Sequence, residues 1–163
     1  TDQLISLQAG AAIWRRISDS LGNVTAEAIA ARSIEELKAM GLSGAKARTF
    51  QAVAAAAQEG RLDLGRLESL GDADAMAALT ALPGIGPWTA QIFLLTAMGR
   101  ADAWPGGDLA LQLGAASLLG LKDRPTTRAM MDLAENWRPY RAAAARLLWC
   151  HYRDLKGLPE SPI

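Results

Sequence analysis

Apolar residues recur along much of the chain at intervals of three and four positions, the spacing that gathers them on one face of a helix. Ile13, Trp14 and Ile17 follow this spacing within the segment LQAGAAIWRRISDSL. Polar or glycine-containing stretches separate such segments, and no segment of strand length alternates apolar with polar residues. The pattern predicts an all-α protein.

Residues that cap helices mark where several of these segments begin. Ser6 and Ser43 stand before two of them, and Ser33 with Glu36 has the spacing of a capping box. The connections are two to eight residues long, which predicts one compact helical domain over residues 1–163. The predicted helices cover residues 7–21, 34–40, 45–59, 63–70, 72–80, 87–99, 108–120, 126–136 and 139–153.

Composition narrows the classes of function. Half of the 163 residues are apolar, which is enough for a substantial core, and the formal net charge is zero. A neutral chain has no general positive field for nucleic acid, although a local binding site stays possible. With Cys150 as its one cysteine and His151 as its one histidine, the chain has neither a disulfide framework nor the usual zinc ligand sets. No apolar run is long enough to span a membrane.

The segment LPGIGPWTAQ, Leu82–Gln91, places a Gly-x-Gly turn before a predicted helix. Glycines at 84 and 86 allow a tight turn and leave its amides uncovered, and Pro87 suits the first turn of a helix. Free amides at a helix start attract phosphate. An ordinary helix–helix turn is the simpler interpretation. The segment lacks the Gly-Lys-Ser/Thr ending of a Walker loop, and no strand precedes it.

A second glycine-rich segment is WPGGD, Trp104–Asp108. Asp108 is placed to cap the helix that begins at Leu109, and capping alone could explain it. A carboxylate at a helix start beside an open loop is also well placed for chemistry on a bulky substrate.

These two segments, with Asp108 twenty-two positions after Gly86, resemble the helix–hairpin–helix DNA glycosylases. The resemblance extends over nearly the whole chain, through QLISLQAGAAIWRRI, GLSGAKART and ENWRPYRAAAARLLW. The last of these looks like the late segment of the 3-methyladenine DNA glycosylase II branch.

The resemblance implies base excision: a damaged nucleotide is flipped out of duplex DNA and its N-glycosidic bond is hydrolysed. Asp108 would stabilise the positive charge that develops on the deoxyribose. Relatives that also cut the strand carry a lysine where this chain has Trp88, so a monofunctional glycosylase is expected. No cofactor is expected, and the lone cysteine excludes the iron–sulfur branch.

The resemblance also implies an aromatic pocket, since an aromatic ring stacks on an alkylated purine and attracts its positive charge. Trp88 and Tyr140 would line this pocket, with Trp104 as a weaker candidate. The chain departs from the bacterial pattern at Ile92 and Leu109, where aromatic residues are often found, so the preferred damaged base stays open. The other tryptophans are expected to pack between helices: Trp14, Trp137 and Trp149.

Contacts with DNA are expected from the N-terminus and from the hairpin. Leu4 would fill the gap that the flipped base leaves, although a core or terminal leucine is an equal alternative. Backbone amides around Gly84, Gly86 and Thr89 would bind phosphate, and a bulky residue at Gly86 is expected to crowd and strain the turn. Hairpin carbonyls in the family often bind Na⁺ or K⁺, and here they would belong to Thr80, Leu82 and Ile85.

The expected partner is damaged double-stranded DNA, bound by a monomer without a membrane. A bacterial, nucleoid-associated location in the cytoplasm is favoured over a eukaryotic nucleus. Because the family's helical domain usually starts earlier, an N-terminal portion before Thr1 is expected. Two competing hypotheses are a non-catalytic helix–hairpin–helix DNA-binding module, in which Asp108 is only a cap, and a helical protein–protein adaptor.

Overall fold

The computed structural model describes residues 7–158, and this part of the chain is helical, without a β-strand. The helices are α1 (Leu7–Leu21), α2 (Ala26–Ala30), α3 (Ile34–Ala39), α4 (Gly44–Gln58), α5 (Leu64–Ser69), α6 (Asp72–Thr80), α7 (Pro87–Thr96), α8 (Leu109–Leu118), α9 (Thr127–Ala134) and α10 (Arg141–Lys156), with a 3-10 helix η2 (Glu135–Trp137). The all-α prediction is confirmed.

Two of the predicted helix starts are confirmed by their caps. The Ser33 side chain accepts from the Glu36 amide, and the Glu36 side chain accepts from the Ser33 amide, so the capping box is complete. Ser43 caps α4 by accepting from the Lys46 amide. The third predicted cap, Ser6, lies outside the described residues.

Helix α2 is absent from the sequence prediction. Thr25 caps it by accepting from the Ala28 amide, but five residues are too few to show a helical period. The single helix predicted over residues 126–136 is α9 followed by η2, and α10 runs three residues beyond its predicted end.

The chain forms two compact units, Thr1–Ile85 and Gly86–Ile163, and one helical domain over residues 1–163 stays a prediction. The boundary falls inside the Gly84–Gly86 turn. Apolar periodicity shows which face of a helix is buried, but it does not show which helices share a core, so the division is invisible in the pattern.

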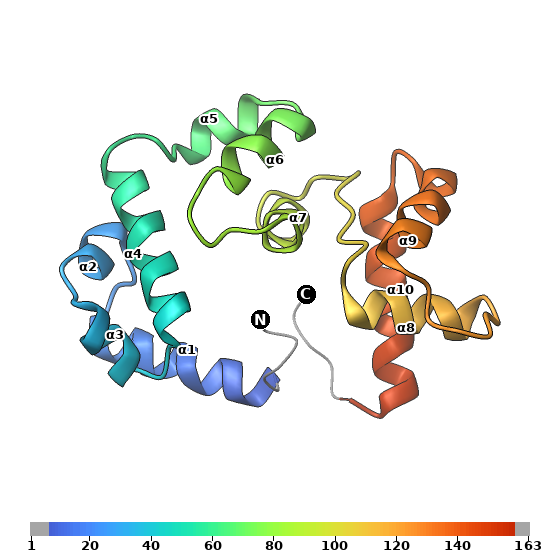
Figure 1. Cartoon of the computed structure of the whole chain (residues 1–163), viewed down its shortest axis with the longest axis horizontal. Coiled ribbons are helices and arrows are strands. Elements are labelled where there is room, and N and C mark those ends of the chain that lie inside the picture. Colours follow the sequence, from blue (N-terminus) through green and yellow to red (C-terminus); the bar gives the residue numbers. More distant parts are fainter. Residues whose placement is uncertain (1–6, 159–163) are drawn as a thin grey trace. The chain divides into compact units, whose positions relative to one another are not determined.

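In the first unit, α2 and α3 pack against α4 (Figure 1). The core cluster combines residues of α1, α3 and α4 with the α3–α4 connection: Ile17, Leu37, Met40, Leu42 and Ala47. Trp14 was expected to pack between helices, yet 52% of its surface is exposed. The helical period of α1 continues through this position, but its side chain stays outside the core.

In the second unit, α8 packs across α10 (Figure 1). A Cβ at Gly114 would lie 2.7 Å from the carbonyl oxygen of Leu148, so only glycine allows this approach. Because α7 ends at Thr96, its connection to α8 covers residues 97–108 and exceeds the predicted eight residues.

Within the described residues, no helix is both long and apolar enough to cross a membrane.

Candidate active site

Asp108 is the N-cap of α8, as its position after the two glycines predicts. Its Oδ1 accepts a hydrogen bond from the Leu111 amide at 3.0 Å. Only 8% of the residue is exposed, which is unusual for a carboxylate, since charged side chains are seldom buried without partners. Capping therefore accounts for one contact of a group that needs several.

Two tryptophans supply the other contacts. The Trp88 indole, at the start of α7, donates from Nε1 to Oδ2 of Asp108 at 3.0 Å. The Trp149 indole, on α10, donates from Nε1 to Oδ1 at 3.1 Å. A carboxylate has about four lone-pair sites. These contacts fill both sites on Oδ1 and one on Oδ2, so one site on Oδ2 is left for a ligand or water.

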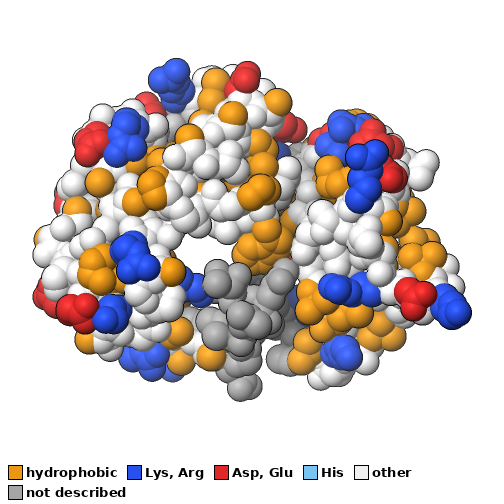
Figure 2. All heavy atoms as spheres, viewed as in Figure 1, with side chains coloured by type: hydrophobic (Ala, Val, Ile, Leu, Met, Phe, Trp, Pro, Cys, Tyr) orange, Lys and Arg blue, Asp and Glu red, His pale blue; other side chains and the backbone are white. Residues whose placement is uncertain are grey.

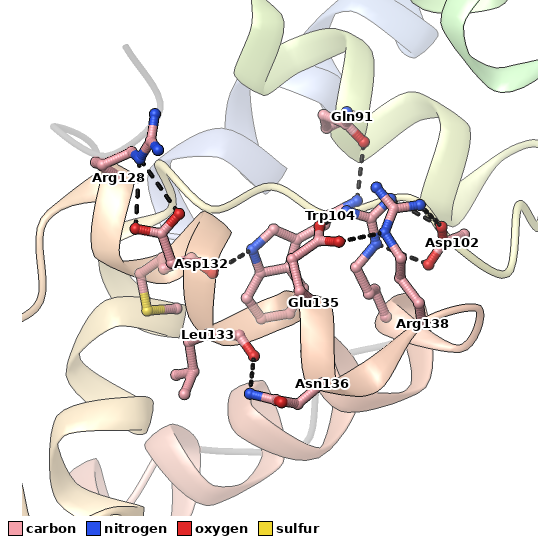
Figure 3. A network of polar contacts seen from close by, with 11 residues as sticks. Gln91, Asp102, Trp104, Arg128, Asp132, Leu133, Glu135, Asn136 and Arg138 are labelled. Carbon is pink, nitrogen blue, oxygen red and sulfur yellow. Dashed lines mark hydrogen bonds and ion pairs between the residues drawn. The ribbon is translucent and has the colours of Figure 1, made fainter.

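Two glutamine side chains, one half-buried and one buried, fix the loop that leads to Asp108. Gln91 of α7 accepts from the Trp104 amide at 2.9 Å (Figure 3). Gln112 of α8 donates to the Gly106 carbonyl at 3.0 Å. A Cβ at Gly106 would lie 2.9 Å from Nε1 of Trp104, so the loop also lies close against its own tryptophan. Side chains of both α7 and α8 thus hold the loop that positions Asp108.

An ion-pair cluster holds the first half of the same loop. Asp102 accepts from Nε and NH2 of Arg141 at 2.7 and 2.8 Å. It also accepts from NH1 of Arg138 at 2.8 Å (Figure 3). Glu135 accepts from Nε of Arg138 at 2.8 Å and lies 3.6 Å from Arg141. Burial by itself raises the pKa of Asp102, but the hydrogen bonds and charge of Arg141, together with the charge of Arg138, outweigh it and hold the pKa below the ordinary value.

Helix α10 is therefore attached to the loop at two points. Arg141 binds Asp102 at the first residue of α10, and the Ala142 amide donates to the Ala101 carbonyl at 2.9 Å. Two turns later, Trp149 reaches Asp108. The two attachments fix where the Trp149 indole stands relative to the carboxylate.

The remaining tryptophans of this unit pack. Trp104 is 2% exposed, its Nε1 donates to the Met130 carbonyl at 3.1 Å, and its ring meets the edge of Trp137 at 5.4 Å. In this structure Trp104 offers no open face to a base, which argues against its predicted place in the pocket. Trp137 packs as expected, whereas Trp149 combines burial with its bond to Asp108.

The other predicted contact residues differ in their surroundings. Trp88 is half-buried and hydrogen-bonded to Asp108, whereas Tyr140 is 68% exposed and stands just before α10. Thr89 is exposed near the start of α7. Leu4 lies outside the described residues.

The two hairpin glycines have different roles. Gly84 has φ +82°, and a Cβ there would overlap the Thr49 hydroxyl of α4, so this position requires glycine. Gly86, the N-cap of α7, has φ −86°, and a Cβ there would meet nothing within 4 Å. The expected backbone strain at Gly86 is therefore wrong, whereas crowding of a phosphate by a bulky residue there stays a prediction. Pro87 occupies the first turn of α7, and no side chain caps its first amides.

The predicted cation site consists of three carbonyls around this turn. The Leu82 carbonyl accepts from the Ile85 amide at 3.1 Å, which leaves it one lone pair for a cation. Thr80 ends α6, and its hydroxyl donates back to the Met76 carbonyl at 2.8 Å. Among residues 7–158, no group of three His, Cys, Asp or Glu side chains could hold a metal ion.

Sequence reasoning found Asp108 and Trp88 but not Trp149, Gln112 or Arg141. One signal was available, because Arg141 and Trp149 are eight residues apart and both lie on the buried side of α10. Gln112 carried no such signal, since a lone glutamine on a helix is usually exposed.

The second unit thus presents a buried carboxylate with a fixed position, three neutral N–H donors and one open acceptor site. Such a group can stabilise a positive charge that develops beside it, or orient a water molecule. The fixed loop around it means that little reorganisation is needed when that charge appears.

Known proteins are similar to this chain in sequence and in fold. The chain is 32% identical over 123 residues to YfjP of Bacillus subtilis, a protein provisionally named a DNA-3-methyladenine glycosylase, covering 76% of this chain and 43% of that protein. It is 30% identical over 151 residues to DNA-3-methyladenine glycosylase 1 of Schizosaccharomyces pombe, covering 90% of this chain and 66% of that protein.

A solved structure of the Schizosaccharomyces pombe 3-methyladenine DNA glycosylase in complex with abasic DNA superposes with a TM-score of 0.84 at 30% identity, covering 91% of this chain and 74% of that one. Residues 1–139 match the family model described as HhH-GPD superfamily base excision DNA repair protein. The chain spans less than half of YfjP and about two thirds of the yeast enzyme. The motif-based resemblance is confirmed: the chain belongs to the HhH-GPD superfamily of base excision DNA repair proteins.

Proposed function

We propose that this protein is a monofunctional DNA glycosylase that removes alkylated purines of the 3-methyladenine type from duplex DNA by hydrolysing the N-glycosidic bond. The observation that carries the proposal is the Asp108 carboxylate, buried at the start of α8 and held by Leu111, Trp88 and Trp149. The names of the relatives support the same substrate class.

Asp108 would act by electrostatic stabilisation. As the base leaves, positive charge grows on the deoxyribose, as in other glycoside hydrolyses. A carboxylate whose partners are neutral N–H groups keeps its full negative charge for this purpose. An arginine or lysine partner would cancel that charge, and no such ion pair is formed by Asp108 within the described part of the chain.

The open acceptor site on Oδ2 suits a water molecule. A water there would donate one hydrogen to the carboxylate and direct its oxygen toward the sugar carbon. With three hydrogen bonds already made, the carboxylate is a weakened nucleophile, so attack by water is favoured over a covalent sugar–Asp108 intermediate.

Trp88 would form one wall of the base pocket. Its indole is oriented by the bond to Asp108 and is half-buried, so one part of the ring stays accessible. Alkylated purines carry positive charge, and an aromatic face attracts a cation in addition to stacking on it. The exposed Tyr140 is the second candidate for this contact.

DNA would be held by the hairpin without a strongly positive surface. The N-terminal amides of α7 have no side-chain cap, and this arrangement attracts phosphate. Gly86 and Thr89 at this helix start, and Gly84 in the turn before it, remain the proposed contacts. Na⁺ or K⁺ on the carbonyls of Thr80, Leu82 and Ile85 would stabilise the turn. A monomer that needs no other cofactor completes the proposal.

The location follows from the substrate. The protein would act where DNA is, in the bacterial cytoplasm and nucleoid, or in the nucleus of a eukaryote.

Base release tests the proposal directly. Methylated duplex DNA is incubated with the protein, and freed bases are separated by chromatography. Asp108→Asn should abolish release while leaving DNA binding intact, because asparagine caps helices about as well as aspartate. Its NH₂ group cannot accept from Trp88, so a modest loss of stability is expected with it.

Asp63→Asn is the matched control. Asp63 caps α5 by accepting from the Gly65 and Arg66 amides, and the same chemical change there should leave release unaltered. Binding without release by the wild-type protein would favour the non-catalytic module, and absence of both would favour the adaptor.

A further inference from the structure

Arg124 lies in the segment between α8 and α9 and is tied to the active-site loop through one buried side chain. Its NH1 donates to Oε1 of Gln112 at 2.9 Å. Gln112 is 4% exposed, and its Nε2 donates to the Gly106 carbonyl at 3.0 Å and approaches the Thr127 hydroxyl at 3.4 Å. The Arg124 guanidinium is thus one amide group away from the loop that carries Asp108.

A second contact places the start of α9 beside the same loop. A Cβ at Gly107, the residue before Asp108, would lie 3.8 Å from Oγ1 of Thr127. Gly107 itself is exposed. The Arg124 segment therefore borders the open side of the loop.

The charge of Arg124 is not neutralised. Arg128 pairs with Asp132, and Arg141 pairs with Asp102. Within residues 7–158 no carboxylate forms an ion pair with Arg124, and its hydrogen-bond partner there, Gln112, is neutral. A guanidinium has five N–H donors in a planar fork, so most of them remain available to an anion.

We infer that Arg124 binds a backbone phosphate of the damaged strand directly beside the flipped nucleotide, with Gln112 holding the guanidinium in place. The inference rests on the proposed glycosylase function. The two phosphates that flank a flipped nucleotide are bonded to the sugar that must face Asp108, so a cation bordering this loop meets one of them. The start of α9, three residues later, adds the positive end of a helix dipole.

A single contact of this kind matters more in this protein than in a basic one. The formal net charge is zero, and on the face shown in Figure 2 Lys and Arg side chains lie among Asp and Glu, without an extended area of positive charge. Affinity for DNA then depends on a few local phosphate contacts, and the loss of one is measurable.

The salt dependence of binding isolates this contact. Binding to a duplex with a tetrahydrofuran abasic analogue, which cannot be turned over, is measured from 50 to 200 mM KCl. The slope of log K against log salt is negative, and each phosphate contact made by a cation makes it steeper by about 0.9. Arg124→Gln should make the slope shallower by that amount. Over this fourfold range of salt, wild-type affinity should then fall about 3.5-fold more than that of the variant.

Two further variants separate charge from structure. Arg124→Lys keeps the charge but loses the planar fork, and should keep the slope. Arg128→Gln removes an arginine four residues away whose charge is already paired with Asp132, and should also leave the slope unchanged. Circular dichroism verifies that each variant is folded, which the exposed position of both arginines favours.

A change in the DNA locates the phosphate. Neutral methylphosphonates replace, one at a time, the two phosphates that flank the abasic analogue. One of them should weaken wild-type binding and leave Arg124→Gln unaffected, because the variant has already lost that contact. The inference would be overturned if Arg124→Gln left the salt slope unchanged, or if Arg128→Gln reduced the slope by the same amount. It would also be overturned if each methylphosphonate weakened binding by Arg124→Gln as much as it weakens binding by the wild type. Base release by the wild-type protein is assayed separately, and its absence would refute the proposed function instead.

Discussion

The ion pair between Asp102 and Arg141 makes a quantitative prediction about how the active-site loop is held. Asp102→Asn removes the carboxylate charge with almost no change in shape. The asparagine can still accept one hydrogen bond, but its NH₂ group faces an N–H donor of Arg141 or Arg138. Three contacts of 2.7, 2.8 and 2.8 Å between opposite charges are thereby reduced to contacts between a guanidinium and the neutral amide oxygen.

The size of the effect follows from the burial of the pair. Charge-assisted hydrogen bonds contribute about 1.5–3 kcal/mol each. The side chains of Asp102 and Arg141 are 17% and 11% exposed, and Glu135 stays 3.6 Å from Arg141 as a partial replacement. Solvent screening and this replacement reduce the loss to about 1–3 kcal/mol in total. For a chain of this size that corresponds to a fall in Tm of about 3–10 °C.

Thermal unfolding followed by circular dichroism measures this fall, and base release measures its consequence at the site. Since α10 is attached to the loop at both Asp102 and Asp108, a loosened start of α10 should displace Trp149 and lower kcat more than it raises KM. Asp132→Asn is the control. That carboxylate forms an exposed pair with Arg128 and should change stability by no more than about 0.5 kcal/mol.

The pH dependence has a definite sign. The pKa of Asp102 lies below its ordinary value of 3.8 in the folded protein, although burial alone raises it, because Arg141 and Arg138 favour the charged form. The contribution of the pair to stability is therefore complete above pH 3.8 and is lost as the pH falls through the folded-state pKa. The Tm difference between wild type and Asp102→Asn should stay constant at neutral pH and shrink below pH 3.8. A difference that grows on acidification, or one no larger than that of Asp132→Asn, would refute the reasoning.

Three other predictions address the hairpin, the lyase position and the pocket. In denaturant unfolding, Gly84→Ala should lower the free energy of unfolding by about 2–4 kcal/mol, because the position has a positive φ and a Cβ there overlaps Thr49. Gly86→Ala should lower it by less than about 1 kcal/mol. Equal losses for the two variants would contradict the assignment of Gly84 as the position that requires glycine. Borohydride should trap no covalent protein–DNA adduct, since Trp88 is the residue that the resemblance aligns with the lysine of strand-cutting relatives, and a trapped adduct would show that another amine attacks the sugar. Tyr140→Ala should weaken binding to lesion-containing duplex in fluorescence anisotropy but leave undamaged duplex nearly unaffected, and an equal loss for both would remove Tyr140 from the pocket.

Local features of the fold were predictable because they are encoded in neighbouring residues. The capping box at Ser33 and the cap at Asp108 each need only the next three positions to form. The turn at Gly84 likewise follows from its own residues. The family was recognisable for the same reason, since its motifs are short and contiguous.

Contacts between distant segments were not predictable from pattern. Trp104, next to the glycines, was placed in the pocket, yet its ring is buried against Trp137 and Met130. Trp149, forty-one positions after Asp108, was assigned to packing alone and proves to hold the carboxylate. Helical period predicts that a tryptophan faces inward, but the polar atom that its N–H meets depends on which helices share a core.

The bond between Trp88 and Asp108 links two tasks that are usually discussed separately. The oxygen that accepts from the Trp88 indole, Oδ2, is also the oxygen with the one remaining acceptor site. If Trp88 forms the proposed pocket wall, a base that tilts the indole ring would move the hydrogen that orients this oxygen. Under the proposed function, the fit of the base would be transmitted to the carboxylate through this one hydrogen bond, and a poorly stacked base would be cleaved more slowly as well as bound more weakly.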